Sequence, residues 1–207
     1  VVAVSDELVP YLVRRRRISS KKVVRIYNGL EILPAHKTNG IKKIITIGSA
    51  GRLVPVKDFE LMIDIARDLC AKMENVRFVL AGDGPEREAL ETKVESFGIE
   101  SYFTLLGHVD DMDEFYKGID IYLNTSRHEG VPMTILEAMV RCLPVVAPDV
   151  GGIREILIDK ETGRLISGRD PGEFALALSG LANSPALIGS MGVKARERVE
   201  KVFSNTS

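Results

Sequence analysis

The sequence predicts an α/β protein, built on a Rossmann-like parallel sheet with helices on both faces. From residue 44 onward, short β-branched runs alternate with longer amphipathic stretches, which is the order expected of βαβ units. The strand-like runs are apolar throughout, as expected of strands that are covered on both faces. Glycine-bearing or polar loops follow these runs, at the sheet edge where such folds bind their ligands.

Five strands and six helices are expected in this part of the chain. The strands are predicted at residues 44–48, 77–81, 104–106, 121–123 and 144–147. The helices are predicted at residues 57–73, 85–97, 112–117, 132–140, 172–181 and 186–202. In the first helix, apolar side chains recur along one face, at Phe59, Met62, Ile63, Ala66 and Leu69.

The region before residue 44 is expected to belong partly to another unit. Strand-like and helical patterns at residues 1–4, 5–17 and 23–27 precede a strong turn signal, Asn28-Gly29, and residues 30–43 have the composition of a linker. We therefore expect residues 1–33 to end one domain and begin the linker, and residues 34–207 to form the next domain. The run from Arg14 to Arg17 fits a phosphate or phospholipid patch, or a solvated helix end whose cations oppose the dipole.

The composition narrows the functional classes. Among 207 residues, 28 Lys and Arg balance 29 Asp and Glu, so no overall positive field favours nucleic acid. The two cysteines, Cys70 and Cys142, lie in separate apolar runs, which argues against a disulfide scaffold or zinc site and favours the cytoplasm. No run approaches the roughly 20 apolar residues of a membrane span, although peripheral contact at the inner membrane face remains open. Both ends of the chain have the abrupt patterns expected of a fragment.

The loop after the first predicted strand has the chemistry of a phosphate site. It runs from Gly48 to Lys57 and contains Gly51, with Arg52 and Lys57 five residues apart at the start of a helix. Glycine allows close backbone approach, the helix start offers free N–H groups, and two cations can neutralise a diphosphate. A surface loop with two solvated cations fits this segment equally well. No G-x-G-x-x-G or P-loop pattern is present.

Two other loops follow predicted strands. The segment from Gly82 to Pro85 favours a structural turn, with proline at the first helical position. The segment from Gly107 to Asp111, which includes His108 and Val109, can offer main-chain groups to a nucleotide base. Alone, neither loop specifies a ligand.

The most informative segment runs from Ser126 to Met139. Pro132 suits the first helical position, so Glu129 precedes the helix and Glu137 lies in its second turn. Free N–H groups of this helix start would attract an anion, and the carboxylates would accept hydrogen bonds from sugar hydroxyls. The alternative is a Glu129 that only complements the helix dipole and an exposed Glu137.

Glu129 and Glu137, spaced as E-x7-E in an EGxPxxxLEAM run, resemble the signature of the retaining GT-B glycosyltransferases of group 1, or family 4. Further matches extend over nearly the whole chain. They comprise Val4-Ser5, Tyr27-Asn28-Gly29, Gly51-Arg52-Leu53 with Lys57, Gly82-Asp83-Gly84-Pro85, Leu106-Gly107, Pro144-Val145-Val146, Gly151-Gly152 with Glu155, and Thr162-Gly163.

The resemblance implies the C-terminal, donor-binding half of a two-domain enzyme, whose N-terminal domain binds the acceptor sugar, lipid or polysaccharide. In such an enzyme Arg52 and Lys57 would hold the diphosphate of a nucleoside diphosphate sugar and stabilise the leaving group. Glu129, with Gly130 beside it, would contact the transferred sugar, and Glu137 the ribose. The implied substrate contacts also include Gly51, the amides of Met133 and Thr134 at the distal phosphate, and His108 and Val109 near the base. No metal and no further cofactor is implied.

Two departures from the family pattern stand out. Asp58 replaces the glycine common after Lys57, which is expected to place a carboxylate beside the phosphate cation and change donor strength. Leu143 replaces the glycine before Pro144, which is expected to affect packing.

The expected activity is retaining transfer from a nucleotide sugar to an acceptor hydroxyl, with little or no transfer by this chain alone. Glu129 fits both a front-face and a double-displacement route. A sugar-nucleotide epimerase, a phosphorylase or a non-catalytic nucleotide-sugar-binding module are alternatives on the same fold.

Overall fold

A computed structural model describes residues 1–3, 8–25 and 43–203 of the chain. At the N-terminus, β1 (Val2–Ala3) pairs in parallel with β2 (Val24–Arg25). Between them lie α1 (Leu8–Arg14) and the short 3-10 helix Ser20–Lys22. The predicted turn at Asn28-Gly29 and the domain boundary after residue 33 fall outside the described residues.

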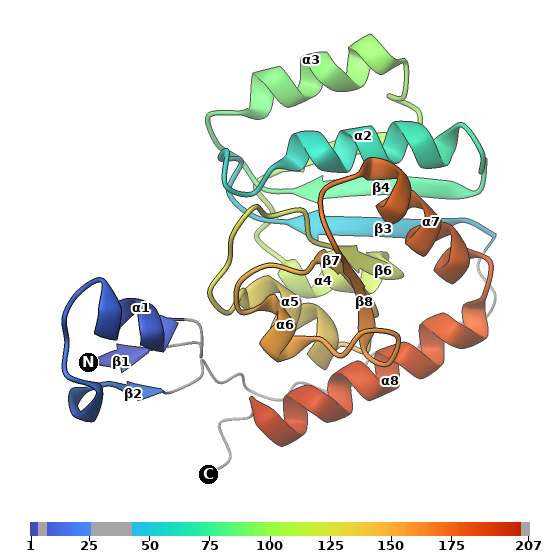
Figure 1. The fold of residues 1–207 in the computed structure, drawn as a ribbon. Coiled ribbons are helices and arrows are strands. Elements are labelled where there is room, and N and C mark those ends of the chain that lie inside the picture. The colour runs from blue at the N-terminus through green and yellow to red at the C-terminus, as the bar shows by residue number, and fades with distance from the viewer. Residues whose placement is uncertain (4–7, 26–42, 204–207) are drawn as a thin grey trace.

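A six-stranded, wholly parallel sheet forms the centre of the main domain (Figure 1), and this confirms the predicted fold class. Its strands are β3 (Ile45–Ala50), β4 (Val76–Ala81), β5 (Phe103–Gly107), β6 (Ile121–Leu123), β7 (Val145–Pro148) and β8 (Gly163–Ile166). The spatial order is β5-β4-β3-β6-β7-β8. The chain therefore builds outward from β3 to β5 and then returns to the other side of β3, which creates a topological switch point between β3 and β6.

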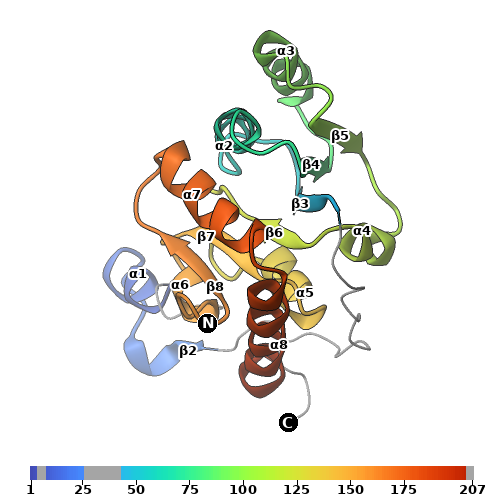
Figure 2. The ribbon, with the colours of Figure 1, turned by 90° about the vertical axis from the view of Figure 1, so that its right-hand side faces the viewer.

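Helices cover both faces of the sheet. They are α2 (Phe59–Cys70), α3 (Arg87–Phe97), α4 (Met112–Gly118), α5 (Met133–Val140), α6 (Ile153–Ile156), α7 (Pro171–Ala182) and α8 (Pro185–Val202). Figure 2 shows α2 and α7 on one side of the sheet and α4 and α5 on the other. Each side has its own hydrophobic core, one packed under α2 and α7 and one under α4 and α5.

The alternation of side chains along β3 divides these two cores. Ile45 and Ile47 belong to the core beneath α2, whereas Ala50 belongs to the core beneath α5. Gly48 lies on the α5 side, where an added Cβ would come within 2.6 Å of the Ile119 side chain. Small residues on this face thus let the chain entering β6 pack closely against β3.

Local chemistry sets the ends of several helices. The Asp111 carboxylate accepts a hydrogen bond from the Glu114 amide at 3.0 Å and so caps α4. Asp170 does the same for α7 by accepting from the Gly172 amide at 2.9 Å, next to Pro171 at the first helical position. Helix α3 ends at Gly98, whose φ of 63° is the left-handed conformation that glycine adopts readily.

The sequence prediction omitted β8 and α6, and most predicted ends differ by one to three residues. Strand β8 is only four residues long and contains Gly163 and Arg164, so it lacks the apolar run expected of a buried strand. Its pairing with β7 supplies the order that its own sequence does not indicate. Helix α5 begins at Met133, because Pro132 has a ψ of 116° and lies just outside the helix.

Among the described residues, no single helix is long and apolar enough to cross a membrane, while α7 and α8 pass that test only as a pair bent by 102°.

Candidate functional site

A pocket of about 420 Å³ lies at the carboxyl edge of the sheet, where β3, β4 and β5 end against the start of α5. It is lined by Ala50, Gly51, Arg52, Ala81, Gly82, Asp83, His108, Val109, Met112, Thr134 and Glu137. Six of the ten predicted site residues are among them: Gly51, Arg52, His108, Val109, Thr134 and Glu137. The four others, Lys57, Glu129, Gly130 and Met133, belong to the neighbouring loop and helix start.

The floor of this pocket is made of backbone. The Gly51 amide donates to the Ala81 carbonyl at 2.9 Å, and the Gly82 amide donates to the Gly107 carbonyl at 2.7 Å. Gly82 has a φ of 139°, and an added Cβ there would lie 1.9 Å from the Gly51 carbonyl oxygen. A side chain at position 82 would therefore collide with the loop after β3. This agrees with the structural role predicted for the turn at residues 82–85.

The two predicted phosphate cations differ in their surroundings. The Lys57 ammonium donates to Glu129 Oε1 at 2.6 Å. Arg52 is exposed, lines the pocket and forms no ion pair with any residue in the described ranges. One cation is thus committed to a carboxylate of the protein, while the other is available to an anion in the pocket.

Glu129 is held in place from three directions. Its Oε1 atom accepts from Lys57 and from the Ser126 hydroxyl, each at 2.6 Å. Its backbone carbonyl accepts from the Gly152 amide at 3.0 Å. These bonds fix the half-buried side chain just ahead of α5. Gly130 beside it is exposed.

Glu137 is half-buried in the second turn of α5, as predicted, so the exposed alternative is wrong. Its Oε2 atom accepts from the Tyr116 hydroxyl at 2.8 Å. Burial, the nearby Tyr122 hydroxyl and the Glu137 carboxylate all raise the pKa of Tyr116 above its usual range, so the phenol stays protonated and remains a donor. Arg141 lies over the Tyr116 ring, 4.8 Å from its centre.

The start of α5 supplies main-chain donors next to these carboxylates. The first amides of any helix have no intrahelical acceptor, which in α5 applies to Met133 and Thr134. Thr134 lines the pocket and Met133 is half-buried beside it. At the opposite rim, His108 is 78% exposed and pairs with Asp110 at 3.1 Å, while Val109 packs partly against the core.

Asp58 behaves differently from the sequence expectation. Its carboxylate forms ion pairs with Arg169 and with Arg127, the latter at 3.1 Å, and none with Lys57. The negative charge next to Lys57 in sequence is therefore neutralised by two guanidinium groups. Leu143, the second departure, is buried in the core beneath α5, as expected for a packing residue.

Sequence reasoning missed three residues that support the site: Tyr116, Ser126 and Arg169. Tyr116 and Arg169 lie in other elements and meet the site only through the fold. Ser126, three residues before Glu129, is the one whose spacing could have been noticed. Within residues 1–3, 8–25 and 43–203, no group of three His, Cys, Asp or Glu side chains is placed to hold a metal ion.

The fold and this pocket define an α/β domain with a pocket at the carboxyl edge of its parallel sheet. Residues 44–184 match the family described as Glycosyl transferases group 1, and the chain belongs to that family. The poly(ribitol-phosphate) alpha-N-acetylglucosaminyltransferase of Staphylococcus aureus is 28% identical over 188 residues, 90% of this chain and 38% of that protein. The trehalose synthase of Pyrococcus horikoshii is 33% identical over 184 residues, 84% of this chain and 43% of that protein.

A solved structure has the same fold as this chain. A mutant of S. aureus TarM, crystallised with fondaparinux, alpha-GlcNAc-glycerol and UDP, superimposes with a TM-score of 0.90 at 24% identity. The match covers 98% of this chain and 41% of TarM. The chain therefore spans less than half the length of each of these matched chains.

Proposed function

We propose that this chain binds the nucleotide sugar of a retaining glycosyltransferase, and that the 420 Å³ pocket holds the nucleoside diphosphate part of the donor. The observation that carries the proposal is the convergence of Arg52, the start of α5 and Glu137 on one pocket. These groups supply a cation, main-chain donors and a hydroxyl acceptor, which are the partners that a diphosphate and a ribose require.

In this proposal the diphosphate lies between Arg52 and the amides of Met133 and Thr134, with Lys57 nearby. These groups stabilise the charge that develops on the departing nucleoside diphosphate, which is the main contribution to catalysis. Because the amides at the start of α5 and the Lys57 ammonium are held by the fold before the donor binds, these groups need little reorganisation during transfer.

The two glutamates take the two sugars of the donor. Glu137 accepts hydrogen bonds from the ribose, since it lines the pocket and Tyr116 occupies only one of its oxygens. Glu129, just before α5, accepts from hydroxyls of the transferred sugar. The loop that carries His108 and Val109 lies next to the base. The acceptor sugar, lipid or polysaccharide binds to a further domain that precedes residue 34, so this chain alone transfers little sugar.

The test is a panel of nucleoside diphosphates measured by thermal unfolding and calorimetry. UDP is the first choice because the similar TarM structure was obtained with UDP. A ligand that binds only the native state raises stability by about 2.7 kcal/mol at one hundred times its Kd. We expect such a rise for at least one of UDP, GDP and ADP, without added metal ion. No binding of any of the three would refute the proposal.

A control variant makes the measurement specific. Arg164→Ala removes an arginine of β8 that pairs with Asp159 on the amino side of that strand and lines no part of the pocket. Nucleotide stabilisation should survive this change and be reduced by Arg52→Ala. Equal loss in both variants would place the nucleotide elsewhere.

A further inference from the structure

Asp58 is an unusual residue at the start of α2. It has φ 50° and ψ 51°, the left-handed conformation that glycine adopts without strain. Its side chain is only 8% exposed. A buried carboxylate is costly unless it is paired, so both the backbone conformation and the charge of Asp58 need support from neighbouring groups.

Arg169, in the loop between β8 and α7, is one of the two cations that pair with the Asp58 carboxylate. One of its terminal nitrogens, Nη2, donates both to Asp58 Oδ2 and to the Thr125 carbonyl, the latter at 2.6 Å. The other, Nη1, donates to the Ser126 carbonyl at 3.2 Å. A single guanidinium thus joins the start of α2 to the segment that follows β6.

Further bonds connect the same two segments. The Thr125 hydroxyl donates to the Lys57 carbonyl at 3.0 Å, and the Arg127 amide donates to the Val56 carbonyl at 2.8 Å. Lys57 and Glu129 form the ion pair described above. Lys57 lies within the first of these segments, and Glu129 follows shortly after the second. The position of one relative to the other therefore depends on how the loops at residues 56–58 and 125–127 are held.

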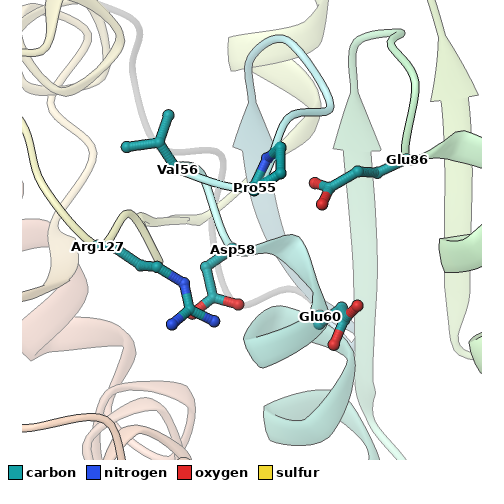
Figure 3. Close-up of a pocket in the computed structure, with 6 residues that line it drawn as sticks. All are labelled: Pro55, Val56, Asp58, Glu60, Glu86 and Arg127. Atoms are coloured by element: carbon teal, nitrogen blue, oxygen red, sulfur yellow. The ribbon is translucent and has the colours of Figure 1, made fainter.

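Figure 3 shows the second partner of Asp58, Arg127, reaching the carboxylate beside a pocket that Glu60 and Glu86 line on its other side. Arg127 is 62% exposed, whereas Arg169 is 30% exposed and is the only one of the two that also contacts backbone carbonyls of residues 125 and 126. A solvated ion pair contributes little to rigidity, so Arg169 is the stronger restraint.

We propose that Arg169 is a positioning residue that holds the segment 125–129 against the start of α2 and thereby sets the geometry of Lys57 and Glu129. Its effect on sugar transfer rests on the proposed function. In that setting the Asp58 carboxylate pairs with Arg169 and does not compete with Glu129 for Lys57. Misplacing the segment by an ångström would shift Glu129 relative to Lys57 and the donor, and catalytic positioning is sensitive to such shifts.

The test compares Arg169→Met and Arg169→Lys with Arg164→Met in the complete enzyme. Arg164 is a matched control because it is 34% exposed and pairs with Asp159 at 3.3 Å, away from the pocket. Lysine keeps the charge but cannot donate to three acceptors in the planar arrangement of a guanidinium. We expect turnover to fall about tenfold in Arg169→Met and nearly as far in Arg169→Lys, with the KM for donor changed less. Arg164→Met should stay near wild type.

Hydrogen exchange supplies a readout that does not depend on activity. The Arg127 amide donates a hydrogen bond to the Val56 carbonyl. Its hydrogen exchange should therefore accelerate in both Arg169 variants and not in Arg164→Met. Thermal unfolding identifies a variant that fails to fold, and in that case Arg169→Lys carries the test.

Each result decides a separate question. Full turnover in Arg169→Lys would show that only charge matters and would overturn the positioning role. So would unchanged exchange at Arg127, or turnover in both Arg169 variants equal to that of Arg164→Met. If the wild-type enzyme neither binds UDP nor transfers sugar, the proposed function fails, and the exchange of Arg127 alone still decides whether Arg169 holds the segment.

Discussion

The two glutamates of the segment 129–137 are eight residues apart and are held by different chemistry. Glu129 accepts from a cation and a hydroxyl on the same oxygen, with Lys57 and Ser126 both at 2.6 Å. Glu137 accepts from a neutral phenol, Tyr116, at 2.8 Å. A charge-assisted pair fixes a carboxylate more firmly than a neutral donor does. Glu129 therefore belongs to a rigid ionic cluster. Glu137 lines the pocket and keeps one carboxylate oxygen for a ligand.

The largest effects on turnover should come from removing either of the two predicted phosphate cations. We predict that Arg52→Ala and Lys57→Ala each lower turnover by about 10² to 10³, by analogy with loss of one oxyanion donor. Only Lys57→Ala leaves a carboxylate without its cation, so it should also lower the free energy of unfolding, by about 1–3 kcal/mol. Arg52→Ala should stay within about 0.5 kcal/mol of wild type. Steady-state kinetics and urea unfolding measure both quantities, and normal turnover in both variants would remove the role assigned to these cations.

Exchanging each glutamate for its amide tests the proposed assignment of Glu137 to the ribose and of Glu129 to the transferred sugar. Glu137→Gln should weaken UDP binding by about 10-fold or more, because a hydrogen bond to a charged group contributes about 1.5–3 kcal/mol. Glu129→Gln should leave UDP affinity within about threefold and lower turnover instead, since UDP lacks the transferred sugar. Calorimetry with UDP and kinetics with the nucleotide sugar distinguish them. The reverse pattern would exchange the two assignments.

The free energy of unfolding should depend on alkaline pH because of the buried phenols, including Tyr116, which donates to Glu137. Burial raises the pKa of Tyr122 to about 12, and burial together with nearby groups raises that of Tyr116 further. In the unfolded chain both lose their protons near pH 10, whereas the folded protein keeps them. Stability is therefore complete below pH 10 and falls above it, by at most about 1.4 kcal/mol per pH unit for each phenol. For Tyr122 this fall ends near pH 12.

Urea unfolding between pH 9 and 11 measures this slope. Tyr116→Phe should make the slope shallower, whereas Tyr11→Phe, which changes an exposed phenol, should leave it as in wild type. The same slope in Tyr116→Phe as in wild type would mean that Tyr116 is not held as a neutral donor.

The smallest effect is expected at the rim. His108 is exposed, and its pairing with Asp110 is a surface contact that contributes little. We predict that His108→Ala changes the free energy of unfolding by less than about 0.5 kcal/mol. UDP affinity should stay within about threefold if main-chain groups contact the base. A larger loss in calorimetry would show that the imidazole itself touches the nucleotide.

The sequence was sufficient to predict the sheet, because its strands carry continuous apolar runs and its helices a clear period. It was not sufficient for β8, whose four residues become a strand by pairing with β7. The candidate site likewise has a part that the sequence predicts and a part that it does not. Gly51, Gly82 and Arg52 could be placed at one edge because they follow strands, and Glu137 because it lies near the start of a helix; all of them line the pocket.

Contacts between residues far apart in the chain could not be predicted from the sequence. Lys57 meets Glu129 across 72 residues, and Asp58 meets Arg169 across 111. The charge of Asp58 was therefore expected beside Lys57, where the covalent chain places it, whereas side-chain direction and burial turn it toward two arginines. The roles assigned to the site residues remain predictions.

The close approach of Gly51 and Gly82 limits how ligand preference can be altered. Because an added Cβ at position 82 would lie 1.9 Å from the Gly51 carbonyl oxygen, that position has no room for a side chain. On the proposed function, a change of nucleotide preference must therefore act on other lining residues, such as His108, Val109 and Met112. A library restricted to these three positions would leave the contact between Gly51 and Gly82 unchanged while it samples new shapes for the proposed base site.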